Sequence, residues 1–196
     1  LDRGRLFRVT PKGHKGYKLP KIDFKTTEGL IAALQNPNNS VRHVAWMELH
    51  KQQNEVKSAL LKLAADKNPR MRARSLWLLS QIKGNQQATV VLAAEDKDEN
   101  IRGMALRIAR QHKLDVIPLI REMCGDGSAL VRRECLIALR HHPSDEAPHL
   151  WAKLANAHDG KDRWYLEALG LAADKQENKF FDNWVAGAKL NTAAAR

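Results

Sequence analysis

Four segments of the chain repeat one pattern at intervals of thirty residues. Each segment begins with Asn or Asp, and an arginine that follows Val, Met or Ile comes six residues later. The first positions are Asn36, Asp66, Asp96 and Asp126, and the arginines are Arg42, Arg72, Arg102 and Arg132. A fixed period of this length is typical of proteins built by stacking equivalent units, each too small to bury a core alone. The repeat therefore constrains the architecture more than any other feature.

Each unit contains two stretches with the apolar spacing of an amphipathic helix. The first stretches cover 27–36, 54–65, 86–95 and 114–125, and the second cover 40–52, 69–82, 98–112 and 128–141. Residue types that favour helix N-caps precede the second stretches, at Asn38, Asn68, Asp98 and Ser128. Neither helix can cover its apolar face within one unit, so neighbouring units must stack. The sequence predicts an all-α fold, a right-handed α-α superhelix of about five helical repeats with a short extended N-terminal arm.

The same pattern predicts the domain boundaries. We expect residues 1–25 to be a basic extended arm or linker, residues 26–190 to be the repeat domain, and residues 191–196 to be a tail. The repeats are expected at about 26–53, 54–84, 85–113, 114–143 and 144–174, followed by a final helix at 178–190.

The fifth copy, "HDGKDRWYLEALGLAAD" from His158, departs from the other four. Arg163 follows Arg132 by thirty-one residues, one residue late. We expect Asp159 or Asp162 to cap the following helix and to pair with Arg163, and the Trp164–Tyr165 pair to be buried against the last helix. Because this aromatic pair has no counterpart upstream, the four residues Asp159, Asp162, Trp164 and Tyr165 are also the candidate docking surface for a neighbouring domain.

The Asp-to-Arg spacing, placed between an inter-helix turn and a column of small residues, resembles the HEAT-like repeat pattern of armadillo-type solenoids. The resemblance implies a ladder in which each arginine reaches an aspartate in its own or the adjacent repeat. Stacked turns would bring arginines to within about 8–10 Å, and interleaved carboxylates would remove their repulsion. The expected members are Asp66, Asp96, Asp126, Arg42, Arg72, Arg102, Arg132 and Arg163. The alternative is a column of arginines that binds phosphates.

A narrower resemblance rests on "GRLFRVTPKG" at 4–13, "TTEGLIAALQNPNNSVRHVAWMELH" at 26–50, "DGKDRWYLEALG" at 159–170 and the tail from 180. These stretches look like the central part of multidomain membrane-bound dehydrogenases or haem-binding proteins of planctomycete-type bacteria. The resemblance implies a β-propeller before the repeats, with "RLFRVT" as its last strand or exit, and a c-type cytochrome domain after them. It also implies an exported or periplasmic location, which the chain itself leaves unknown. The chain has no CxxCH motif, so no cofactor is expected in this segment.

The net charge of +11 raises a second possibility, a nucleic-acid-binding protein such as a HEAT-like alkylpurine DNA glycosylase. Residues 1–25 carry +6 of this charge, and the other 171 residues carry +5. The nearly balanced body makes a nucleic-acid partner the weaker hypothesis. A glycosylase would need an acid and aromatic side chains that converge on a groove. The only candidates are Asp159, Asp162, Trp164 and Tyr165, with Trp77 as one further exposed tryptophan.

Motifs of the common catalytic and metal sites are missing from the sequence. It contains no GxSxG elbow, no HExxH and no CxxC, and no apolar run of about 18 residues that could span a membrane. Cys124 and Cys135 occupy core positions of the repeat, where a thiol is inert. We therefore expect no catalytic, cofactor or metal residues. The predicted function is a non-catalytic scaffold that binds protein domains, as a spacer between a dehydrogenase-like propeller and a cytochrome domain.

Overall fold

The computed structural model describes residue 7 and residues 9–16 and 20–187, and in these residues it contains α-helices, one short 3₁₀ helix and no β-strand. The α-helices are α1 Thr27–Leu34, α2 Asn39–Gln52, α3 Lys57–Ala64, α4 Pro69–Gln81, α5 Gln86–Ala94, α6 Glu99–Gln111, α7 Ile117–Met123, α8 Ala129–Leu139, α9 Ala147–Asn156, α10 Arg163–Ala173 and α11 Glu177–Gly187. The 3₁₀ helix η1 covers Gln53–Val56. The predicted all-α solenoid is confirmed.

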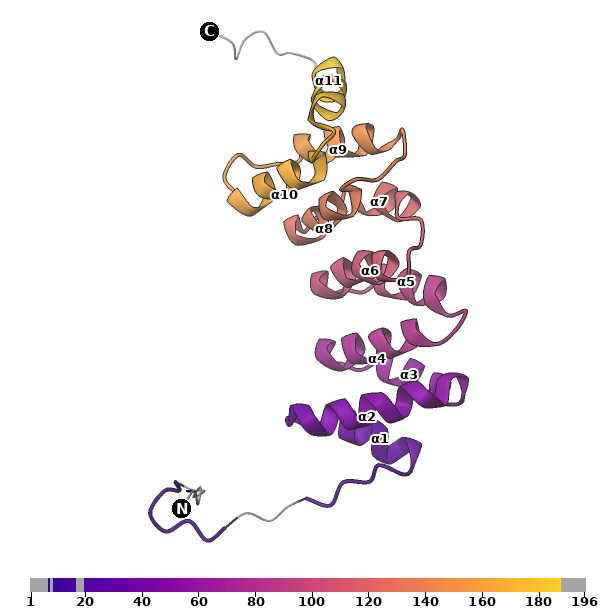
Figure 1. The fold of residues 1–196 in the computed structure, drawn as a ribbon, viewed down its shortest axis with the longest axis vertical. Helices are drawn as coiled ribbons and strands as arrows, with labels where there is room; N and C mark the ends of the chain where they lie inside the picture. The colour runs from indigo at the N-terminus through magenta and orange to yellow at the C-terminus, as the bar shows by residue number, and fades with distance from the viewer. Residues whose placement is uncertain (1–6, 8, 17–19, 188–196) are drawn as a thin grey trace, which may run out of the picture.

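The helix pairs are stacked along the long axis of the molecule in chain order, from α1 and α2 at the N-terminal end to α9 and α10, with α11 at the C-terminal end (Figure 1). In the first three layers, a first helix packs against the second helix that follows it, as α1 does with α2, α3 with α4 and α5 with α6. The second helices α2, α4, α6, α8 and α10 also contact one another from layer to layer. This arrangement joins the apolar faces of all layers into one core.

The turn before each second helix follows one hydrogen-bonding pattern. The predicted N-cap side chains each accept a hydrogen bond from the backbone N–H two residues later, at Asn38, Asn68, Asp98 and Ser128. Two residues before each cap, an Asn or Asp side chain accepts from the N–H of the cap residue, at Asn36, Asp66, Asp96 and Asp126. These bonds satisfy N–H groups that a helix start leaves without partners. The repeated Asp therefore shapes its own turn before it contacts any other layer.

Two columns of the repeat fill the core. The small residues Ala45, Ser75, Ala105 and Cys135 are fully buried. Leu76, Leu106 and Leu136 follow them and are also buried, while Trp46 packs at the edge of the same core. Close packing requires small and large side chains to alternate in this way across facing helices.

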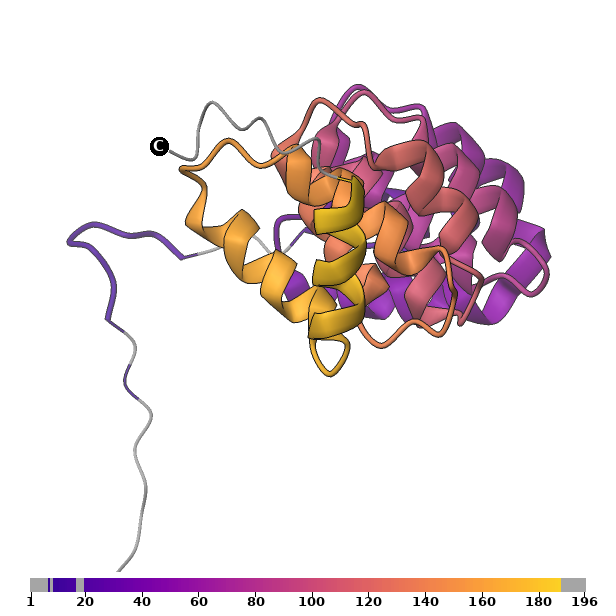
Figure 2. The same ribbon diagram turned by 90° about the horizontal axis from the view of Figure 1, so that it is seen from above.

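The last layer differs from the others. The helix α9 packs more extensively against α11 than against α10, and α10 diverges from the stack when the molecule is seen from above (Figure 2). Leu166 of α10 is 60% exposed, and Gly170 is exposed at the position where α8 has the buried Leu136. No helix of the described residues covers this side of α10.

The two ends of the chain correspond only in part to the predicted boundaries. Of the stretch "RLFRVT", the structure describes Phe7, Val9 and Thr10, and these residues adopt neither strand nor helix. The final helix predicted at 178–190 is α11, and residues 188–190 lie outside the described residues, as does the predicted tail.

Candidate functional site

Two arginines and two aspartates join three successive layers through paired hydrogen bonds. Arg72 donates from Nε and Nη2 to the two carboxylate oxygens of Asp96, both at 2.8 Å. Arg102 donates in the same way to Asp126, at 2.7 and 2.9 Å. In both arginines, Nη1 donates to two backbone carbonyl oxygens of the arginine's own turn. Each guanidinium thus holds its own turn and the next turn in register.

These pairs are largely removed from solvent. The side chains of Arg72 and Asp96 are 6% and 10% exposed. Burial acts to raise the pKa of Asp96, but hydrogen bonds from Arg72 and from the Asp98 N–H outweigh it and hold the pKa below its ordinary value. The hydrogen bonds from Arg102 lower the pKa of Asp126 in the same direction. Because the carboxylates already occupy Arg72 and Arg102, these arginines cannot form a phosphate-binding column.

Arg163 is not a member of this ladder, contrary to the sequence prediction. Its side chain is 82% exposed, and Nε lies 3.5 Å from the Glu167 carboxylate on the same helix. The N-cap of α10 is Asp162, which follows the previous cap, Ser128, by thirty-four residues, whereas the earlier caps are thirty apart. Four extra residues therefore precede α10, shared between a longer first helix, α9, and a longer turn, and Leu166 takes the ladder position.

The ladder ends at Arg132 for a related reason. Arg72 and Arg102 pair with the residue twenty-four positions ahead, and for Arg132 that residue is Asn156, whose Oδ1 accepts from Trp184 Nε1 at 2.7 Å. The Arg132 guanidinium instead lies over the Tyr165 ring, 5.5 Å from its centroid. A cation over an aromatic face is attracted by the ring quadrupole.

The four residues predicted as a docking surface are not gathered at one site. Asp159 accepts hydrogen bonds from the N–H groups of Lys161 and Asp162, which lower its pKa and fix the long turn. Asp162 caps α10 through the Tyr165 N–H. Tyr165 is only 1% exposed, and its hydroxyl donates to the Leu154 carbonyl at 2.9 Å. Of the aromatic pair, only Tyr165 is buried, and its contacts are with Leu154 of α9 and Arg132 of α8 rather than with the last helix.

Trp164 was expected to be buried, but it is 71% exposed and lines a groove on the second-helix side of the molecule. This docking groove, of about 540 Å³, lies between α8 and α10 and reaches α6. The apolar side chains in it are Leu130, Ile137, Trp164, Ala168 and Leu171. Trp164 and Leu171 lie seven residues apart on α10, and Leu130 and Ile137 lie seven apart on α8, so each pair shares one helix face.

The charged residues at the rim of the docking groove form ion pairs. Arg107 of α6 pairs with Glu134 of α8, and this contact raises the pKa of Arg107. Arg133 of α8 lies 3.3 Å from Asp162, and Glu167 pairs with Arg163. Because each rim charge already has an opposite partner, the groove has an apolar floor and an almost neutral rim. Such a surface suits a protein partner better than a phosphate backbone.

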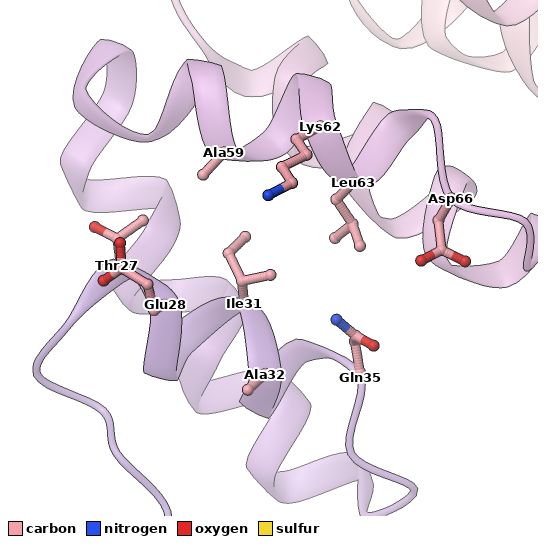
Figure 3. Close-up of a pocket in the computed structure, with 9 residues that line it drawn as sticks. All are labelled: Thr27, Glu28, Ile31, Ala32, Gln35, Ala59, Lys62, Leu63 and Asp66. Atoms are coloured by element: carbon pink, nitrogen blue, oxygen red, sulfur yellow. The ribbon is translucent and has the colours of Figure 1, made fainter.

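A second hollow lies between the first helices α1 and α3 (Figure 3). It measures about 420 Å³, and Ile31, Ala32, Ala59 and Leu63 form its apolar part. Lys62 points into it toward Ile31, and Asp66 and Gln35 stand at its edge (Figure 3). Its chemical groups offer no nucleophile with an adjacent base, so this hollow records loose packing between the first two layers rather than catalytic geometry.

Groups that could support catalysis or metal binding are few in the described part of the chain. Cys124 and Cys135 are both buried, and burial raises the pKa of the Cys135 thiol. Three or more His, Cys, Asp or Glu side chains do not converge on a possible metal position anywhere in the described residues. Among those residues, too, no helix has both the length and the apolar character needed to cross a bilayer.

Sequence reasoning missed most of the docking groove. Leu130, Ile137 and Leu171 were not singled out, although a signal for Leu130 existed. The column at the second position after the N-cap is polar in α2, α4 and α6 and becomes apolar in α8 and α10, at Leu130 and Trp164, whereas the ninth-position column is mixed throughout. An apolar side chain at a position that is polar in an earlier repeat indicates a surface with another role than the core.

A comparison with protein families identifies part of this solenoid. A family model described as HEAT repeats matches residues 27–106, from α1 into α6. No curated protein and no solved structure matches the chain. The chain therefore contains a HEAT-like repeat region, and the helical stack continues beyond that region to α11.

Proposed function

We propose that this chain is a non-catalytic scaffold that holds a neighbouring protein domain against the docking groove. The observation that carries the proposal is the exposed Trp164 side chain beside an apolar floor that two layers share. Tryptophan buries a large area with few rotatable bonds, and it is enriched among residues that dominate binding energy. Repeat solenoids in general offer extended surfaces of this kind.

The finer role that we propose is that of a spacer within a larger redox protein. The resemblance to multidomain dehydrogenases supports this role, with a propeller domain before the repeats and a cytochrome domain after them. Layers spaced by about 9 Å give five repeats a span of about 45 Å. A flexible linker would not hold two domains at a fixed separation of that size.

A photo-crosslinking residue at position 167, which lines the docking groove and leaves Trp164 in place, tests the groove in the full-length gene product. We expect cross-links from position 167 to a peptide outside residues 1–196. Position 92 is the control, because Leu92 is also partly exposed but lies on the first helix α5. Cross-links that are equally frequent from both positions, or formed from neither, contradict the proposal.

The geometry gives less support to a nucleic-acid enzyme. A glycosylase would need Asp162, Trp164 and Tyr165 to face one pocket, but Tyr165 is buried and Asp162 pairs with Arg133. We expect any salt-sensitive DNA binding to depend on the basic arm. Deletion of residues 1–25 should abolish such binding, and binding that survives the deletion would favour the nucleic-acid hypothesis.

A further inference from the structure

A pocket at the other end of the stack has a different chemical character. It measures about 380 Å³ and is lined by Leu34, Asn39, Arg42, His43, Trp46 and Arg74 of the first two layers. Two guanidinium groups and one imidazole border it, next to the apolar side chains of Leu34 and Trp46. None of its lining residues, all of which belong to the described part of the chain, carries a carboxylate.

Arg42 is the first arginine of the repeated pattern, and half of its bonding matches that of Arg72 and Arg102. Its Nη1 donates to the carbonyl oxygens of Asn36 and Pro37, at 2.7 and 2.6 Å. The edge formed by Nε and Nη2, which holds a carboxylate in the next two layers, meets none here. Nη2 donates to the Asn39 side chain, and Nε has no hydrogen-bond partner among the described residues.

Asp66 would be the ladder partner of Arg42 if the spacing of twenty-four residues applied, but the two do not pair. The Asp66 carboxylate accepts a hydrogen bond from the Asn68 N–H at 2.7 Å and borders the hollow between α1 and α3. Figure 3 shows it at the edge of that hollow, across from Gln35. Because Asp66 faces this hollow, the Nε–Nη2 edge of Arg42 has no carboxylate partner in the described part of the chain.

The surroundings of the pocket carry an excess of positive charge. The helix α4 contains Arg70, Arg72 and Arg74 and no acidic residue, and only Arg72 has a carboxylate partner. Arg74 donates to the Leu34 carbonyl at 2.9 Å. Its pKa lies below the ordinary value because of burial and the nearby charges of Arg42 and Arg70. The only acid of α2, Glu48, pairs with Lys51.

We propose that this pocket binds a carboxylate group from outside the described fold. The fork is the Nε of Arg42 together with its Nη2, which the ligand would share with or take over from Asn39, and Arg74 is the second cation. The chain itself shows which ligand suits that edge, because Asp96 and Asp126 occupy it in the next two layers. The planar fork matches a carboxylate through two parallel bonds. This site is separate from the docking groove and does not depend on it.

The direct test follows the Arg Nε–Hε signals of the complete chain, labelled with ¹⁵N-arginine, by NMR at fixed ionic strength. The probes are glutarate, an acetylated Ala-Glu-Ala amide and inorganic phosphate. We expect a saturable shift of the Arg42 signal with glutarate or the peptide, while the signals of Arg72 and Arg102 stay unchanged. Tighter binding of the peptide than of glutarate assigns the ligand to an acidic protein segment, and the reverse order assigns it to a small carboxylate.

Two variants and a control complete the test. Arg42→Lys keeps the charge but loses the fork, so binding should weaken about tenfold. Arg74→Gln should weaken it to a similar extent, whereas Arg110→Gln, which removes an exposed charge on α6, should leave it unchanged. Absence of any Arg42 shift in the unmodified chain overturns the proposal without reliance on the variants. Tighter binding of phosphate than of both carboxylates, or equal losses in all three variants, also overturns it.

Discussion

Arg72 and Asp96 are separated by twenty-four residues in the sequence, yet they join the second and third layers of the stack through two hydrogen bonds of 2.8 Å. The same guanidinium also donates to the carbonyls of Asp66 and Lys67 in its own turn. A single side chain therefore satisfies backbone acceptors locally and fixes the distance to the neighbouring layer. This relationship leads to two predictions about stability.

Asp96→Ala should lower the free energy of unfolding by about 3 kcal/mol, because it leaves the buried Arg72 guanidinium without its carboxylate partner. Arg163→Ala is the matched control, since the exposed Arg163–Glu167 pair should contribute less than about 0.5 kcal/mol. Urea unfolding followed by circular dichroism measures both. Similar losses for the two variants would contradict a structural role that is specific to the ladder.

The ladder should also make the free energy of unfolding depend on pH in the acidic range. Asp96 and Asp126 have lower pKa values in the folded chain than the ordinary value, which is about 3.9 in an unfolded chain. Their contribution is therefore fully present above about pH 4 and is lost as the pH falls through the folded pKa values. Unfolding should be measured across this range for the unmodified chain and for Asp96→Asn. The variant should show a weaker pH dependence below pH 4, and an identical dependence would refute the prediction.

Two helical glycines should respond differently to replacement by alanine. A Cβ at Gly103 of α6 would lie 3.0 Å from Leu130 Cδ2 and 3.3 Å from Glu134 Cγ, so Gly103 permits the close approach of α8. A Cβ at Gly170 would meet no atom within 4 Å. Gly170→Ala should raise the melting temperature, because it gains about 1 kcal/mol of helix propensity.

In Gly103→Ala, the close contact of the new Cβ with α8 should cancel the gain in helix propensity. Gly103→Leu should lower the free energy of unfolding by about 1–3 kcal/mol. Thermal unfolding of the three variants measures these effects. If Gly103→Ala stabilised the chain as much as Gly170→Ala, the packing of α6 on α8 would have room for a Cβ at position 103, and the prediction would be wrong.

Most of the fold could be predicted from the sequence because its signals are local. The N-caps Asn38, Asn68, Asp98 and Ser128 act within two residues of their own position, and all four function as expected. The small column from Ala45 to Cys135 was visible because four copies agree, and each of its members is fully buried. Because the repeat occurs four times, each cap and each core column is supported by four independent positions.

The sites were harder to predict because they depend on how layers meet. Arg163 looked like the fifth ladder arginine, but the four extra residues in α9 and the turn before α10 moved Leu166 into that position. Trp164 and Tyr165 are neighbours in sequence, and the direction of α10 decides that one is exposed and the other buried. Neither outcome can be read from the residue types alone.

The sequence by itself thus determined the repeating pattern, the starts of the second helices and the core columns, since hydrogen bonds and apolar spacing within one turn decide these features. It placed the starts of α3 and α7 three residues too early. Only the tertiary structure decided which ladder arginines meet a carboxylate, and where the docking groove and the Arg42 pocket lie. The physical reason is that pairs such as Arg72–Asp96, and the lack of one at Arg42, depend on the distance and tilt between whole layers. Those quantities follow from packing across the entire stack and are not encoded in any single repeat.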